Sequence, residues 1–328
     1  MRIRKAGKIN DRLWYLGREE SGVYILEGRD CSIMINGGFS FILPDVLAQM
    51  RDFEIDAQKI KKFLILHSHF DHAGIAPYFR RTRPDIMFYA SAPAWKVFAM
   101  PKAMEVMNRF SRISAKWMGV ESVLDAYDMD WRGDVGGTAI GEGDRIDLGG
   151  VALGIMDTPG HSHCSITAYE ADEGLLFASD AVGVAYRDMT FPSMNTDVNQ
   201  YLHSLQKLKP LPVACVCADH YGYITGKEAA GFVGITIEEG RKWKGSFEAC
   251  CRRHGGDIDA AGKEMTALFV REYPDYLIAP EILEGVFRQM MKSVAGKTSD
   301  PGYFPVQHEK GSNSRDDQPD DEQDFTKA

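Results

Sequence analysis

Short runs of aromatic and β-branched residues, separated by glycine, dominate the N-terminal part of the chain. Three runs read RLWYLG, GVYILEG and CSIMINGGFS, and each predicts a β-strand. The pattern becomes helical from Pro44 to Met50. A buried strand is then predicted over Phe63–Leu66, and the run IMFYASA predicts another. The first part of the chain therefore combines strands with at least one helix.

A stretch of helical character interrupts this pattern between about residues 94 and 130. Apolar side chains recur there at steps of four, three and four, and form one helix face: Val106, Phe110, Ile113 and Trp117. Four methionines lie in the same region: Met100, Met104, Met107 and Met118. Two interpretations remain open. The apolar face either packs into the core, or it covers a site where flexible methionines face an apolar substrate.

The strand pattern returns after Gly133 in VALGIMDTPG and LLFASDAVG. Asp197–Leu208 predicts an amphipathic helix with Asp197 near its N-cap, and LPVACVCADHYG predicts a strand followed by a loop. Residues 227–294 predict three helical segments, interrupted by HGGD and YPDYLIAP, and we expect this extension to cover the site. Residues 295–328 are polar and acidic and predict a disordered tail.

Composition narrows the class of protein. The 328-residue chain is 44% hydrophobic, which is enough for a sizeable core, and its net charge of −9 argues against a nucleic-acid partner. No apolar run approaches the roughly 18 residues of a membrane span, and the first residues lack a signal-peptide pattern. The six cysteines form no CxxC pair. We therefore expect a cytoplasmic protein with free thiols.

The densest chemistry lies in HSHFDH, where His67, His69, Asp71 and His72 fall within six residues. In an extended segment His67 and His69 point the same way, so both can bind one metal. Imidazole and carboxylate suit Zn, Fe or Mn. The simpler explanation is a solvated loop rich in histidine. However, the whole chain holds only nine histidines, and three of them fall within this one motif.

Three further segments have the same layout. Each apolar, strand-like run ends in a loop that begins with a potential ligand, and these ligands are His161, Asp180 and His220. Strands of one layer often place such residues along the same edge of a sheet. The sequence therefore predicts that these residues converge with the HSHFDH segment.

The motif HSHFDH resembles the HxHxDH signature of the metallo-β-lactamase superfamily. TPGHSHCS, ASDAVG and ADHYG resemble its later blocks, in the same order, and the resemblance covers Ile9–Gly226. It implies an α/β fold, a four-layer αββα sandwich over residues 1–226, with the helical insert and the C-terminal helices as additions.

The resemblance also implies two divalent metal ions, zinc or iron, with manganese as a third candidate. The implied ligands are His67, His69 and His161 for the first metal, and Asp71, His72 and His220 for the second, with Asp180 bridging them. A hydroxide between two metals would attack a carbonyl or phosphoryl centre. Asp71 would orient that hydroxide and relay a proton.

Two departures from the family pattern stand out. Many members carry Asp-Thr-Gly where this chain reads Ile35, Asn36, Gly37 and Gly38, and relatives often have glycine before the last histidine, where this chain has Asp219. Other residues near the motifs are candidates for substrate binding: His163, Tyr221 and Tyr223.

The family hosts many reactions, so the fold alone names no substrate. The ligand set resembles that of hydrolases of the glyoxalase II kind, and the layout loosely resembles the bacterial quinolone-signal response thioesterase. Both imply hydrolysis of a thioester, ester or lactone. Helices rich in Met, Phe and Trp favour a small substrate with an apolar part, and their surface is compatible with a homodimer. A di-iron redox enzyme and a non-catalytic signalling or partner-binding protein with a structural metal centre are the alternatives.

Overall fold

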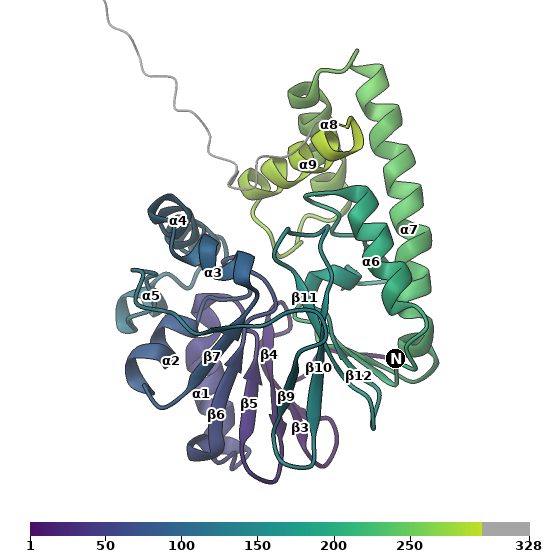
Figure 1. Ribbon diagram of the computed structural model, residues 1–328. Coiled ribbons are helices and arrows are strands. Elements are labelled where there is room, and N and C mark those ends of the chain that lie inside the picture. The colour runs from purple at the N-terminus through teal and green to yellow at the C-terminus, as the bar shows by residue number, and fades with distance from the viewer. Residues whose placement is uncertain (297–328) are drawn as a thin grey trace, which may run out of the picture.

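Two seven-stranded sheets face each other in the computed structural model, which describes residues 1–296 (Figure 1). The predicted tail over 295–328 thus lies almost entirely outside the described residues. The first sheet has the strand order β2-β3-β4-β5-β6-β7-β8. Its strands are β2 (Gly7–Lys8), β3 (Leu13–Gly17), β4 (Gly22–Glu27), β5 (Ser32–Ile35), β6 (Ile60–Leu64), β7 (Met87–Ala90) and β8 (Thr138–Ala139).

The second sheet has the order β1-β16-β15-β12-β11-β10-β9. Its strands are β1 (Arg2–Ile3), β9 (Arg145–Asp147), β10 (Ala152–Asp157), β11 (Ile166–Glu170), β12 (Leu175–Phe177), β15 (Cys215–Cys217) and β16 (Tyr223–Thr225). A separate hairpin pairs β13 (Val184–Tyr186) with β14 (Met189–Phe191).

Helices cover the outer faces of both sheets, which completes the four αββα layers implied by the sequence (Figure 1). The helices are α1 (Leu43–Asp52), α2 (Ala76–Thr82), α3 (Ala92–Phe98), α4 (Pro101–Trp117), α5 (Ser122–Ala126), α6 (Val198–Leu208), α7 (Gly226–Arg253), α8 (Ile258–Glu272) and α9 (Pro280–Val294). Short 3₁₀ turns lie at Ser40–Ile42, Ala57–Lys59 and Ser179–Val182. Within residues 1–296, none of the helices combines the length and apolar character of a membrane span.

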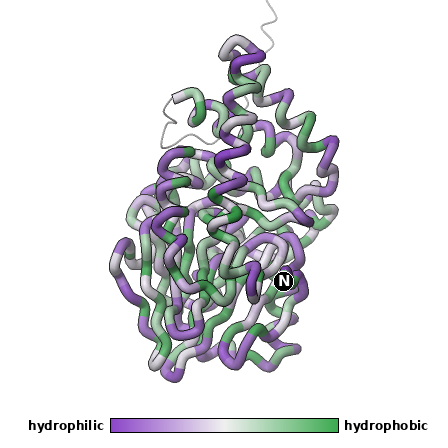
Figure 2. The backbone as a smooth tube through the Cα atoms, turned by 90° about the vertical axis from the view of Figure 1, so that its right-hand side faces the viewer, coloured by the Kyte–Doolittle hydropathy of each residue, from purple (hydrophilic) through white to green (hydrophobic). Residues whose placement is uncertain are grey.

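The alternation of side chains along the strands explains the layers. On β4, Tyr24 and Leu26 join the core between the sheets, while Val23 and Ile25 join the core beneath the helices. All four are fully buried, because a central strand of a covered sheet has two apolar faces. Hydrophobic and hydrophilic stretches alternate throughout the chain, including the helices above the sandwich (Figure 2).

The three helices α3, α4 and α5 lie between β7 and β8, in the region where the helical insert is expected. On α4, Val106 and Phe110 are buried as predicted, but Trp117 is 46% exposed. The methionines divide between the two interpretations: Met107 is in the core, and Met100 is exposed and lines a cavity. Part of this region therefore packs into the core, and part of it covers a cavity, so each of the two interpretations holds for some of its residues.

Helix α6 begins where its N-cap residue predicts. The Asp197 carboxylate accepts hydrogen bonds from the backbone N–H groups of Asn199 and Gln200, both at 2.9 Å. Replacing Asp197 with alanine is expected to lower the free energy of unfolding by about 1 kcal/mol, because both N–H groups lose their acceptor. Chemical unfolding measures this effect, and Asp188→Ala, a change of an exposed carboxylate outside the helices, is the matched control. Equal midpoints for the two variants would contradict the capping role.

Candidate metal centre

Four strands deliver the predicted ligands to one rim of the sandwich. β6 ends just before His67, β10 before His161, β12 before Asp180, and β15 before His220. In the second sheet β12 and β15 are parallel, and β10 runs in the same direction because β11 is antiparallel to both β10 and β12, so these three strands end at one edge. β6 of the other sheet ends beside them, since His67 meets His161. The structure therefore brings all seven predicted ligands together.

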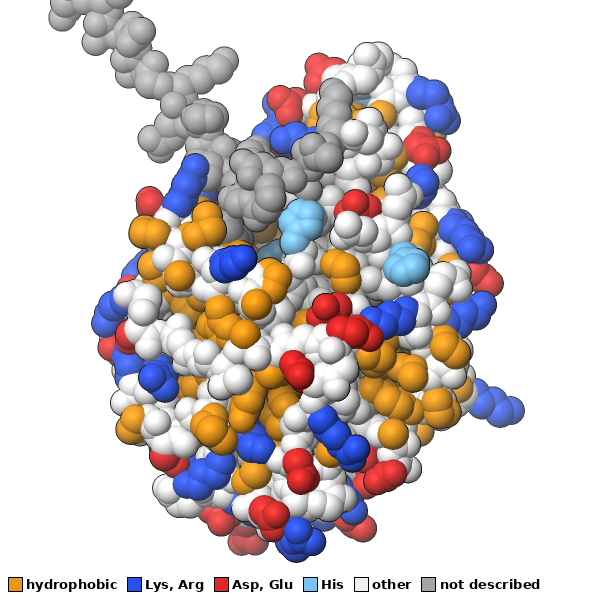
Figure 3. Space-filling view, in the orientation of Figure 1, with side chains coloured by type: hydrophobic (Ala, Val, Ile, Leu, Met, Phe, Trp, Pro, Cys, Tyr) orange, Lys and Arg blue, Asp and Glu red, His pale blue; other side chains and the backbone are white. Residues whose placement is uncertain are grey.

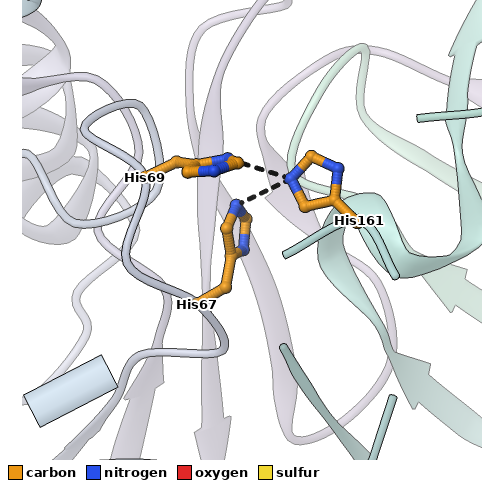
Figure 4. A group of neighbouring side chains, drawn as sticks. All are labelled: His67, His69 and His161. Atoms are coloured by element: carbon orange, nitrogen blue, oxygen red, sulfur yellow. Dashed lines mark hydrogen bonds between the residues drawn. The ribbon is translucent and has the colours of Figure 1, made fainter. Parts of the chain in front are cut away.

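The first group consists of His67, His69 and His161 (Figure 4). The Nε2 atom of His161 lies 3.2 Å from Nε2 of His67 and 2.9 Å from Nδ1 of His69. The three rings point toward one another from two segments far apart in the sequence (Figure 4). The second group consists of Asp71, His72 and His220. The Nε2 atoms of its two histidines lie 3.1 Å apart, and Asp71 Oδ2 lies 3.7 Å from each.

The carboxylate of Asp180 lies between the two groups. Its Oδ2 atom is 3.5 Å from Nε2 of His161 and 3.4 Å from Nε2 of His72, and its Oδ1 atom is 3.7 Å from Nε2 of His220. One short side chain thus reaches histidines of both groups. A bridging carboxylate requires this position.

Hydrogen bonds on the far side of two rings fix which nitrogen faces the centre. Nδ1 of His161 donates to the carbonyl of Ser193, and Nδ1 of His220 donates to the carbonyl of Glu20, each at 2.8 Å. A carbonyl only accepts, so both protons reside on Nδ1. The Nε2 lone pairs are therefore free to bind a metal.

Burial and charge set the protonation of the centre. Burial lowers the pKa of His69 to about 4 and that of His161 to about 3, so both rings are neutral at pH 7. Burial also opposes a charge on His72, but the carboxylates of Asp180 and Asp71 outweigh it and raise the pKa of that ring. Burial would raise the pKa of Asp180, but the neighbouring imidazoles, led by His72, hold it below its usual range.

These observations fit a pair of divalent cations. Five imidazoles and two carboxylates are ligands that Zn, Fe and Mn share, and the ligand atoms within each group lie within 4.8 Å of one another. Neutral lone pairs face one another in the first group. In the second, two carboxylates favour a positive charge. A cation in each group satisfies both conditions.

A cavity of about 480 Å³ opens beside the centre. Its apolar wall comes from α3, α4, α9 and the segment before α9, with Val97, Met100, Phe110, Leu277 and Ile282 among the lining residues. Apolar side chains also gather on the surface over the insert helices (Figure 3). The volume is typical of small-molecule sites.

The three candidate substrate contacts have different environments. His163 is exposed and lines this cavity together with a smaller neighbouring one. Tyr221 is buried, and its hydroxyl accepts a hydrogen bond of 3.1 Å from the backbone N–H of Leu277. Tyr223 lies in the core between the sheets, 6.0 Å from the ring of Tyr15. Among the described residues, Tyr276 contributes to the cavity wall, whereas Tyr221 and Tyr223 do not.

Two residues outside the predicted ligand set also shape the centre, Cys164, whose thiol the sequence offered only as an unneeded ligand, and Ser179, which sequence reasoning missed. Cys164 is buried, and its sulfur lies 3.4 Å from the backbone N of Ser68 and 3.2 Å from its hydroxyl. It thus braces the turn between His67 and His69. Ser179 precedes Asp180 and has a positive φ of 48°, a strained backbone conformation that surrounding contacts must stabilise. The position of Ser179 directly before Asp180 was the only signal in the sequence for its role.

A separate group of possible ligands, away from this centre, lies where α7 and α8 meet and consists of Cys250, His254 and Glu264. Nε2 of His254 lies 2.5 Å from Glu264, and Arg253 also pairs with that carboxylate. Ion pairs within the protein thus already balance the charge of this group.

The chain belongs to the metallo-beta-lactamase superfamily, whose family model matches residues 16–220, more than half of its length. Its fold is the metallo-beta-lactamase fold. Similar proteins include the human and bovine acyl-coenzyme A thioesterases MBLAC2, which are 26% and 27% identical to the chain over 188 residues. Each match covers 53% of this chain and 62% of the relative, so the chain spans less than two thirds of the curated relatives' length.

Solved structures show the same fold. The family protein TTHA1429 from Thermus thermophilus is 16% identical, with a TM-score of 0.59 over 85% of this chain and 94% of that protein. The Cronobacter sakazakii metallo-beta-lactamase with the HARLDQ motif is 18% identical, with a TM-score of 0.55 over 76% and 96%. At this identity the likeness concerns the fold alone.

Proposed function

We propose that the protein is a binuclear metal-dependent hydrolase that attacks the carbonyl of a thioester, ester or lactone. The position of Asp180 is the observation that carries this proposal, because its two oxygens reach histidines of both groups. A single-metal site would not require a carboxylate between two complete ligand groups.

Two metal ions supply a nucleophile at neutral pH and polarise the attacked carbonyl. Side chains of the protein would hold the two ions and orient the attacking water. His67, His69 and His161 would hold one ion, and Asp71, His72 and His220 the other, with Asp180 shared. Asp71 lines the cavity, so its carboxylate can orient an attacking water and accept its proton.

The shape of the cavity supports a substrate with an apolar acyl part. Val97 and Met100 approach it from the insert side, and Ile282 approaches it from α9, so an acyl chain would lie between the two sets of helices. The similarity to acyl-coenzyme A thioesterases supports the same substrate class. His163 at the rim would contact the polar part of the substrate.

The first test is elemental analysis of protein purified without added metal, together with an absorption spectrum and assays on a panel of thioesters and lactones. Two zinc ions per chain, no colour, and turnover of one panel member support the proposal. Two iron ions with thiol-dependent oxygen uptake would favour the redox alternative. Two metals without turnover of any substrate would favour a structural centre.

Val97→Asp tests the apolar wall. Val97 is half-buried on α3 and lines the cavity, so a carboxylate there would meet the acyl chain of the substrate. We expect kcat/KM for long acyl chains to fall by about tenfold or more, because burying an unpaired charge is unfavourable. Short acyl chains should be affected less. The control is Ile235→Asp on α7, an exposed position that is not in the cavity wall, and equal losses in both variants would contradict the assignment.

A further inference from the structure

One buried carboxylate outside the predicted ligand set gathers three hydrogen-bond donors. Asp219 is 2% exposed. Its Oδ2 atom accepts from Nδ1 of His72 at 2.7 Å, from the hydroxyl of Ser179 at 2.5 Å, and from the side-chain amide of Asn36. A buried carboxylate is tolerated when donors satisfy it in this way.

Two of the donors lie on segments that carry proposed ligands, and the third is hydrogen-bonded to such a segment. His72 is itself a proposed ligand, and Ser179 directly precedes Asp180. Asn36 accepts a 2.9 Å hydrogen bond from the backbone N–H of Leu66, next to His67, through the oxygen of its amide. Asp219 itself precedes His220. A single oxygen atom therefore connects segments from both sheets at the rim.

The Nδ1 proton of His72 has a different kind of acceptor from the Nδ1 protons of His161 and His220. His161 and His220 donate to neutral backbone carbonyls, whereas His72 donates to a carboxylate. A carboxylate partner fixes the ring and strengthens the opposite nitrogen as a ligand. That opposite nitrogen, Nε2, faces His220 at 3.1 Å.

We propose that Asp219 is a positioning residue for the second metal, a role that rests on the binuclear centre proposed above. It holds His72 with its proton on Nδ1 and its Nε2 lone pair toward Asp71 and His220. Through Ser179 it also stabilises the strained turn that presents Asp180.

The two departures from the family pattern then have one explanation. This chain carries Asn36 where many members have aspartate, and Asp219 where relatives often have glycine. The side chains touch in the structure. In this chain the carboxylate of the pair lies in the loop after β15, and Asn36 at the end of β5, whose φ of 61° suits asparagine or aspartate, is its donor.

The test measures zinc binding to the metal-free full chain by competition with a chelator. In Asp219→Asn, which keeps the shape of the side chain, we expect one of the two binding steps to weaken by about 10- to 100-fold. The other step should change by less than about threefold. The double variant Asn36→Asp with Asp219→Asn returns a carboxylate to the cluster, and we expect it to recover part of the lost affinity.

Circular dichroism and the unfolding midpoint of the metal-free variants separate positioning from folding. Unchanged affinities at both steps would overturn the proposal, as would equal weakening at both steps. If Asp219→Asn does not fold, long-range ¹H–¹⁵N spectra of the zinc-loaded wild type decide the question: a proton on Nδ1 of His72 is expected, and metal bonded at Nδ1 overturns it. A wild-type stoichiometry below two metals would instead overturn the binuclear function, and this role with it.

Discussion

Asp180→Ala is expected to reduce hydrolysis by at least a thousandfold, a loss of about 4 kcal/mol of transition-state stabilisation. The carboxylate faces histidines of both ligand groups at 3.4–3.7 Å. Without it, two neighbouring cations would lose the shared carboxylate that offsets their repulsion. Metal content should therefore fall as well, while the circular dichroism spectrum should stay that of the wild type.

The matched control is Asp144→Ala, which removes an exposed carboxylate that is not in the wall of the main cavity. It should leave both turnover and metal content within about twofold of the wild type, because surface changes have small effects. If Asp180→Ala kept full activity and two metals, the ligand assignment would be wrong.

Removal of metal from the full chain is expected to abolish turnover and to lower Tm by several degrees. A ligand present at a thousand times its Kd stabilises the folded state by about 4 kcal/mol, and this contribution disappears on chelation. Activity and Tm should both return after two equivalents of zinc or iron, and a third equivalent should add nothing.

Removal of metal from the Asp180→Ala variant provides the comparison. Because this variant already holds less metal, chelation should lower its Tm by less than it lowers the Tm of the wild type. Turnover by protein that contains no metal in elemental analysis would rule out the proposed chemistry.

The convergence of the candidate ligands could be predicted because four of them open loops that follow apolar strands. His67, His161, Asp180 and His220 all occupy loops that begin at strand ends, and parallel strands bring those ends to one edge. The structure brings the seven residues that the sequence singled out close together, and their role as ligands stays a prediction. The helix over Asp197–Leu208 could also be predicted from the sequence, because the side chain of Asp197 caps its start.

The remaining features depend on contacts between distant segments, which no local pattern encodes. Periodicity placed Trp117 on a buried face, but α4 ends there, and the side chain is 46% exposed. Tyr223 follows the HYG segment closely, yet strand pairing with β15 places it between the sheets. The role of Asp219 likewise depends on donors that lie 40 to 183 positions away in the sequence.

The cavity wall has two origins along the chain. The reactive rim lies within residues 16–220, which match the family model, whereas Tyr276, Leu277, Ile282 and Leu283 come from beyond that segment. The hydroxyl of Tyr221 accepts a hydrogen bond from Leu277 and so joins the two parts one residue after the last ligand. The segment that matches the family thus carries the candidate ligands and the insert side of the cavity wall, and the residues beyond it complete that wall. A substitution in α9 or in the segment before it would therefore change part of the cavity wall without removing any candidate ligand.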